Sequence, residues 1–181
     1  MTSRALLLLP VALLALASPA AAINVVPGTD GDDQLVGTSG RDYVDGRGGD
    51  DVILGRAGND ELDGGRGADR LSGGADRDSL DGGAGHDVLR GGPGPDFLAD
   101  YDGGDLLLGG TGDDSAVLAS GAAGGSHLRL GPGNDDVIVQ QDGLVDVIDC
   151  GAGQDVAEWV DARDPHDRYL GCETVQEYLG Y

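Results

Sequence analysis

Aliphatic residues recur at every ninth position between residues 28 and 117, each flanked by neighbours of mixed polarity. They are Leu35, Val44, Ile53, Leu62, Leu71, Leu80, Leu89, Leu98 and Leu107, followed by Ala116. Alternate side chains of a β-strand face opposite sides, so the aliphatic residue points one way and its neighbours the other. The pattern predicts strands of three residues, each with one side chain in a core. A period this short predicts a solenoid.

Aspartate and glycine keep the same phase. Glycine holds the first position of nine of the ten units, with Asp100 as the exception, and the fourth position of nine, with Asp76 as the exception. The unit is Gly-x-x-Gly-x-Asp-x-(aliphatic)-x, and residues 82–90 are its cleanest copy. The sixth position is always aspartate: Asp33, Asp42, Asp51, Asp60, Asp69, Asp78, Asp87, Asp96, Asp105 and Asp114.

A disordered Gly/Asp-rich tract is the alternative interpretation. Disorder does not require glycine, aspartate and aliphatic residues to keep a common phase. We therefore retain disorder only as a description of the metal-free chain.

These residue types point to a metal. Glycine tolerates positive φ and has no Cβ, so the loop can turn tightly and direct its carbonyls toward one point. The aspartate two residues later adds a carboxylate. A cluster of oxygen donors without nitrogen or sulfur suits Ca²⁺, which accepts six to eight oxygens in irregular geometry, better than Mg²⁺. We therefore predict the ten aspartates to be calcium ligands.

A second period indicates how the units stack. Asp45, Asp63 and Asp81 recur every eighteen residues rather than every nine. Two nonapeptides would then make one full turn, so that units one apart lie on opposite sides and units two apart stack.

The run resembles the repeats-in-toxin, or haemolysin-type, calcium-binding nonapeptide Gly-Gly-x-Gly-x-Asp-x-(large apolar)-x. The resemblance covers about half of the chain and implies an all-β fold, a parallel β-roll. It also implies that each ion lies between stacked loops, held by carboxylates of the sixth position and by loop carbonyls. One side would use Asp33, Asp51, Asp69, Asp87 and Asp105, and the other Asp42, Asp60, Asp78, Asp96 and Asp114. The stacked loops of the two sides would leave about eight gaps in which ions could bind.

Some units depart from the pattern. Thr29, Thr38, Arg47 and Arg56 replace the second glycine in the first four units. We expect these N-terminal sites, and those around Asp76 and Asp100, to be the weakest.

Residues 1–22 have the features of a Sec-type signal peptide. Arg4 precedes an apolar run from Ala5 to Ala17, and Ala20-x-Ala22 fits the cleavage site. We expect cleavage after Ala22 and an extracellular protein. The alternative, an uncleaved anchor helix, requires a longer run.

The charge narrows the range of partners. The formal net charge is −22, and no basic tract offers itself to nucleic acid or to an anionic membrane. Calcium ions are the predicted partners, because about eight of them would offset most of the excess acid.

The last third, residues 118–181, repeats the pattern in relaxed form, and Asp135 and Asp155 each occupy a similar loop. Cys150 and Cys172 are the two cysteines, and an even pair in an exported chain predicts a disulfide. Aromatic residues also gather here. We interpret the segment as a disulfide-linked C-terminal cap on the β-roll of residues 23–117. It resembles the ending of many actinobacterial secreted calcium-binding repeat proteins.

The sequence contains no Gly-x-Ser-x-Gly elbow and no His-Glu-x-x-His zinc motif, so we predict no enzyme. The predicted function is extracellular calcium binding, with folding and rigidity coupled to the ion. One alternative is a calcium-stabilised adhesion or cell-envelope interaction protein with an unidentified envelope or glycan partner. A solenoid polysaccharide lyase or hydrolase is the other alternative.

Overall fold

The computed structural model describes residues 23–119, 125–140, 143–160 and 165–177, and these residues form strands and turns without a helix. Accordingly, this part of the chain offers no helix that is long and apolar enough to cross a membrane. The predicted signal peptide lies outside the described residues.

Seventeen strands divide into two sheets. The nine-stranded sheet consists of β1 (Asn24–Pro27), β3 (Asp42–Asp45), β5 (Glu61–Asp63), β7 (Ser79–Asp81), β9 (Phe97–Asp100), β11 (Ser115–Leu118), β13 (Asp136–Gln140), β15 (Val156–Val160) and β17 (Thr174–Glu177). The eight-stranded sheet consists of β2 (Gln34–Val36), β4 (Val52–Ala57), β6 (Arg70–Ala75), β8 (Val88–Pro93), β10 (Leu106–Thr111), β12 (His127–Pro132), β14 (Val147–Ala152) and β16 (Arg168–Leu170).

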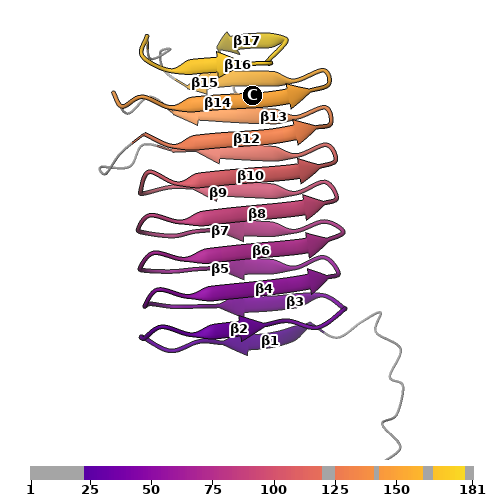
Figure 1. The fold of residues 1–181 in the computed structure, drawn as a ribbon, viewed down its shortest axis with the longest axis vertical. Coiled ribbons are helices and arrows are strands. Elements are labelled where there is room, and N and C mark those ends of the chain that lie inside the picture. Colours follow the sequence, from indigo (N-terminus) through magenta and orange to yellow (C-terminus); the bar gives the residue numbers. More distant parts are fainter. Residues whose placement is uncertain (1–22, 120–124, 141–142, 161–164, 178–181) are drawn as a thin grey trace, which may run out of the picture.

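The chain alternates between the two sheets, and every pairing within a sheet is parallel. Leu62 pairs with Val44 on one side and with Leu80 on the other, so neighbouring strands are offset by eighteen residues. Figure 1 shows the resulting stack, with the turns gathered along two opposite edges. The predicted parallel β-roll is confirmed as a solenoid of about eight turns. Two nonapeptides form each turn up to residue 117, and most later turns are longer.

Strand length differs between the sheets. Strands β5 and β7 have the predicted three residues, whereas β4, β6, β8 and β10 have six. The longer strands continue pairing through the glycine-rich segment, where Arg56 pairs with Gly74 and Ala57 with Ala75. Arg56 and Gly74 both adopt positive φ, 90° and 118°, a conformation that is easy for glycine and uncommon for arginine.

The core lies between the two sheets. All ten predicted aliphatic residues are buried, and most of them are completely shielded from solvent. Further apolar side chains join the core after residue 117: Leu118, Leu130, Val139 and Cys150. Each of these stands two residues after another inward residue, as Leu130 follows Leu128. Strands β11, β12, β13 and β14 therefore bury two apolar side chains each, where most earlier strands bury one.

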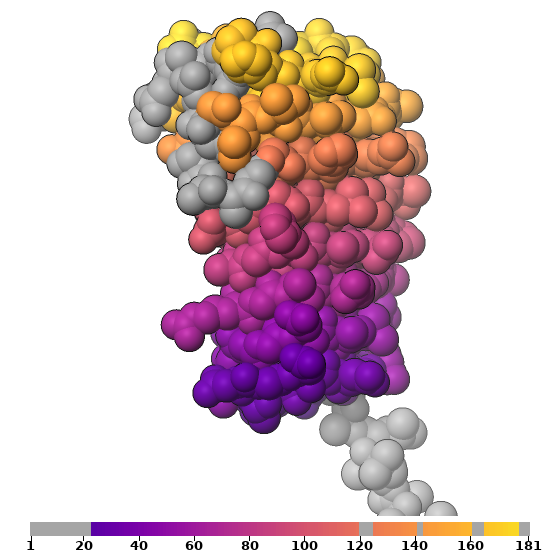
Figure 2. Space-filling view, turned by 60° about the vertical axis from the view of Figure 1, so that its left-hand side comes forward, coloured from indigo at the N-terminus to yellow at the C-terminus, as the bar shows by residue number. Residues whose placement is uncertain are grey.

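The C-terminal residues extend the same two sheets. Strand β13 pairs with β11, and β17 ends the nine-stranded sheet. In the space-filling view the turns follow one another as bands from indigo to yellow (Figure 2). The predicted disulfide is confirmed: Cys150 on β14 is bonded to Cys172, which precedes β17. This bond links the last turns of the roll.

Candidate metal centre

The ten predicted aspartates lie in two rows along opposite edges of the roll. Row 1 consists of Asp33, Asp51, Asp69, Asp87 and Asp105, each placed directly before a strand of the eight-stranded sheet. Row 2 consists of Asp42, Asp60, Asp78, Asp96 and Asp114, each at or directly before the start of a strand of the nine-stranded sheet. All except the half-buried Asp33 are buried.

Within each row, one carboxylate oxygen links neighbouring turns. The backbone N–H of Asp51 donates to Oδ1 of Asp69 at 2.7 Å, and that of Asp69 donates to Oδ1 of Asp87 at 2.8 Å. Row 2 repeats the bond at 2.9 Å from Asp60 to Asp78. A hydrogen bond from a backbone N–H to a charged acceptor is among the stronger kinds, so Oδ1 fixes both the side chain and the spacing of the turns.

The other oxygen of most of these carboxylates has no partner. Oδ2 is buried and accepts no hydrogen bond in these residues: Asp51, Asp60, Asp69, Asp78, Asp87, Asp96, Asp105, Asp114, Asp135 and Asp155. A buried polar atom normally finds a partner, and a buried charge normally finds a counter-ion or a metal. A regular series of such atoms fits the binding of cations better than it fits a local packing defect.

Glycine at the first position makes room for this oxygen. A Cβ placed on Gly64 would lie 2.6 Å from Oδ2 of Asp69 and 2.6 Å from the carbonyl oxygen of Gly82 in the next turn. Two oxygens thus approach the same point, one from a side chain and one from the backbone. Glycine is required there because any side chain would occupy the space that the two oxygens share.

Burial raises the pKa of these carboxyl groups. The pKa of Asp78, Asp105 and Asp114 rises to about 7, and that of Asp60, Asp87, Asp96 and Asp135 to about 6. Desolvation is the main cause, opposed by the hydrogen bond to Oδ1, and in Asp78 and Asp114 neighbouring carboxylates add to the rise. Without a cation, each added negative charge is unfavourable in the fold.

Backbone oxygens must complete any metal site. Among the described residues, no three acidic, histidine or cysteine side chains converge on one point. The carboxylates alone therefore cannot supply the six to eight oxygens that Ca²⁺ takes. The carbonyls of the first glycine lie beside Oδ2, as at Gly82, and the donor set of carboxylate and carbonyl oxygens fits a hard cation.

The first two turns differ from the rest. The backbone N–H of Thr29 donates to Oδ2 of Asp33 at 2.6 Å, and that of Thr38 donates to Oδ2 of Asp42 at 2.6 Å. Both threonine hydroxyls also donate to the same carboxylates. The oxygen that is unpartnered elsewhere is satisfied here, so threonine in place of glycine caps the N-terminal end of each row.

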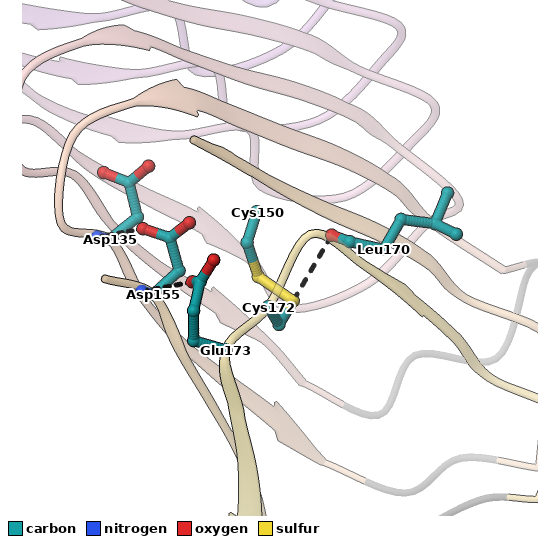
Figure 3. Close-up of a disulfide and its surroundings, with 6 residues drawn as sticks. All are labelled: Asp135, Cys150, Asp155, Leu170, Cys172 and Glu173. Carbon is teal, nitrogen blue, oxygen red and sulfur yellow. Dashed lines mark hydrogen bonds between the residues drawn. A yellow bond between two sulfur atoms is a disulfide. The ribbon is translucent and has the colours of Figure 1, made fainter. Parts of the chain in front are cut away.

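Both rows continue beyond residue 117. Row 1 passes from Asp105 to Ser126, Asp146 and Asp167, each accepting the backbone N–H of the preceding member. Row 2 passes from Asp114 to Asp135, Asp155 and Glu173. In Figure 3, Asp135, Asp155 and Glu173 lie one after another beside the Cys150–Cys172 disulfide.

Sequence reasoning proposed Asp135 and Asp155 but missed Ser126, Asp146, Asp167 and Glu173. Longer loops shift the three residues of row 1 out of the nine-residue phase, to spacings of 20 or 21 residues. Glu173 keeps the spacing of 18 residues from Asp155, but it is not an aspartate. The signal that remains is local. An apolar or aromatic residue stands two positions after each of them, as Ile148 does after Asp146 and Val175 after Glu173.

Comparison with known proteins agrees with this geometry. A family model described as RTX calcium-binding nonapeptide repeat (4 copies) matches residues 27–62 and again residues 63–98. No curated protein shows a significant match to the chain.

We predict that Gly64→Ala lowers the stability of the calcium-loaded roll by about 1–3 kcal/mol, because the new Cβ would overpack the space beside Asp69. Chemical denaturation in CaCl₂ measures this change. Gly31→Ala is the matched control, since a Cβ there meets nothing within 4 Å. Equal losses in the two variants would contradict the role assigned to the first glycine.

The raised pKa values predict the pH dependence of the metal-free chain. The folded state holds protons at Asp78 and Asp114 up to about pH 7, whereas the unfolded chain releases them near pH 4. The folded state thus binds more protons in this interval, and its stability falls as pH rises through it. Far-UV circular dichroism of the calcium-stripped protein should show more β-structure near pH 5 than near pH 8. An increase with pH would contradict the prediction.

Proposed function

From the premise that residues 27–98 belong to the RTX calcium-binding nonapeptide repeats, we propose that this calcium-binding repeat protein is extracellular and that its folding and rigidity are coupled to Ca²⁺. The series of buried, unpartnered Oδ2 atoms carries the proposal. The ten aspartates of rows 1 and 2 are the proposed ligands, assisted by loop carbonyls. The bound ion supplies positive charge where the fold brings carboxylates together.

The coupling follows from the composition of the core. Most of the strands up to residue 117 bury one aliphatic side chain each, which is a thin core for a repeat array. Meanwhile each turn buries a carboxylate whose pKa is raised by desolvation, as in Asp87. A cation that binds the folded state adds its binding free energy to folding. Removal of the ion leaves the repulsion between the carboxylates of each row without compensation.

Residues 118–181 have the proposed role of a cap. The strands of the described part of this segment gain Leu118, Leu130, Val139 and Cys150 as core residues, and the disulfide closes a loop with a sequence separation of 22. Such a closure stabilises by roughly 3 kcal/mol in the chain-entropy model. These turns therefore depend less on the metal than residues 23–117 do.

The extracellular assignment rests on two features. The Sec-type signal peptide of residues 1–22 directs export, with cleavage after Ala22, and the Cys150–Cys172 disulfide is typical of an oxidising compartment. Extracellular Ca²⁺ is abundant enough for sites of modest affinity. The proposal assigns the protein no catalytic activity.

We expect the secreted chain to lose most of its β-structure in EGTA and to regain it in millimolar CaCl₂, because the carboxylate rows need the cation. Circular dichroism during a calcium titration measures the transition. Asp87→Asn should raise the calcium midpoint by about tenfold, equivalent to about 1.4 kcal/mol. Asp30→Asn, at an exposed aspartate, is the control with an unchanged midpoint. A full β signal in EGTA would refute the coupling.

A second candidate function, adhesion to the cell envelope, is favoured by one surface. The outer face of the eight-stranded sheet carries the exposed Arg70, Arg90, Arg129 and Arg168. Valine and leucine side chains accompany them, including Leu54, which is 42% exposed. Arginine beside apolar surface in so acidic a protein suits an anionic glycan.

The envelope candidate predicts binding of anionic glycans on an array in CaCl₂. Arg90→Glu combined with Arg129→Glu should abolish this binding, since both arginines lie on the outer face of the eight-stranded sheet. Arg41→Glu is the control, because this exposed arginine lies at the edge of row 2. Undiminished binding by the double variant would exclude the face as the binding surface.

A further inference from the structure

Row 1 contains one member that is not acidic. At Asp51, Asp69, Asp87 and Asp105 a single carboxylate has two roles: Oδ1 accepts the N–H of the preceding member, and Oδ2 stays buried and unpartnered. At the turn after Asp105 the row continues with Ser126. Its Oγ accepts the N–H of Asp105 at 3.2 Å, so the hydroxyl takes over the first role. The hydroxyl carries no negative charge, so it does not replace Oδ2 in the second role.

A carboxylate from the turn below lies at this position. Asp100 stands where nine units have glycine, and its side chain is 3% exposed. The Ser126 hydroxyl donates to Oδ2 of Asp100. In the next turn Leu118 pairs with Asp100. The aligned first positions of successive turns form a column, which changes here from glycine to apolar residues. Asp100 is thus the boundary residue of that column, and its carboxylate reaches the turn of Ser126.

Asp105 provides the second half of the arrangement. Its side chain is 2% exposed, and its Oδ2 has no hydrogen-bond partner. Ser126 joins the two residues, since its Oγ accepts the N–H of Asp105 and its hydroxyl donates to Oδ2 of Asp100. Both buried acidic residues therefore border the turn of Ser126.

We propose that Asp100, Asp105 and the turn of Ser126 form a rebuilt Ca²⁺ site, in which Asp100 supplies the carboxylate that row 1 lacks at Ser126. This inference rests on the proposed calcium-binding function of the rows. It replaces the expectation that the substitution of glycine by Asp100 weakens the site. Two carboxylates with neighbouring carbonyls give this gap the same charge as the gap between Asp87 and Asp105, and suit a hard divalent cation.

Ion counting by equilibrium dialysis tests the site, with Ca²⁺ itself as the probe. Asp100→Gly restores the repeat consensus, yet it should reduce the count by one ion per chain. Asp100→Asn, which keeps the shape of the side chain, should do the same. Asp100→Gly combined with Ser126→Asp should regain the ion, because the row then has its own carboxylate.

Asp76→Gly is the matched control. It also restores a consensus glycine, but Asp76 is exposed, so the ion count should stay at the wild-type value. Circular dichroism in CaCl₂ shows that each variant is folded. If wild-type protein binds calcium and both Asp100 variants retain the full count, this inference is wrong while the proposed function stands. If wild-type protein binds no calcium, both this inference and the proposed function are wrong.

Discussion

The structure depends on the stacking of like-charged carboxylates in the interior of its turns. Parallel pairing places Asp69 directly between Asp51 and Asp87, one strand spacing of about 4.8 Å away on either side. From Asp51 and Asp60 onward Oδ1 is held by a backbone N–H, so these carboxylates cannot turn outward without breaking the links between turns. Their Oδ2 atoms are buried without a hydrogen-bond partner. A cation between the turns would relieve both the desolvation and the repulsion, which is the physical basis of the proposed coupling between metal binding and folding.

Glycine is the condition for this arrangement. The first position has to leave room for Oδ2 and for a carbonyl of the next turn, as at Gly64. Where the chain uses threonine at the second position, the N–H and hydroxyl of Thr29 and Thr38 satisfy the oxygen instead. The row is thereby closed at its N-terminal end by hydrogen bonds. Small changes in the loop therefore decide whether Oδ2 of the aspartate accepts a hydrogen bond or is available to a cation.

The sequence predicted the fold well because its period is the physical repeat. The period of nine placed one aliphatic residue in each strand, and the eighteen-residue recurrence of Asp45, Asp63 and Asp81 predicted the register that pairs Asp45 with Asp63. Prediction was weaker where loops lengthen, because an inserted residue shifts the phase while the strands keep their pairing. Asp146 was missed for that reason, whereas Glu173 keeps the eighteen-residue spacing from Asp155 but is not an aspartate. The direction of the Asp100 side chain was not predictable, since it depends on Ser126 in the next turn.

The two ends of the roll are stabilised by different means, and Asp100 lies where they meet. Before it, the first position is always glycine, and the proposed coupling makes these turns depend on cations. After it, Leu118, Leu130 and Val139 fill the corresponding places with apolar side chains, and the disulfide ties β14 to the segment before β17. Because hydrophobic burial needs no ion, the C-terminal turns offer a formed strand edge to the turns that precede them. Under the proposed coupling, each N-terminal turn would therefore gain its partner strand and its ion together.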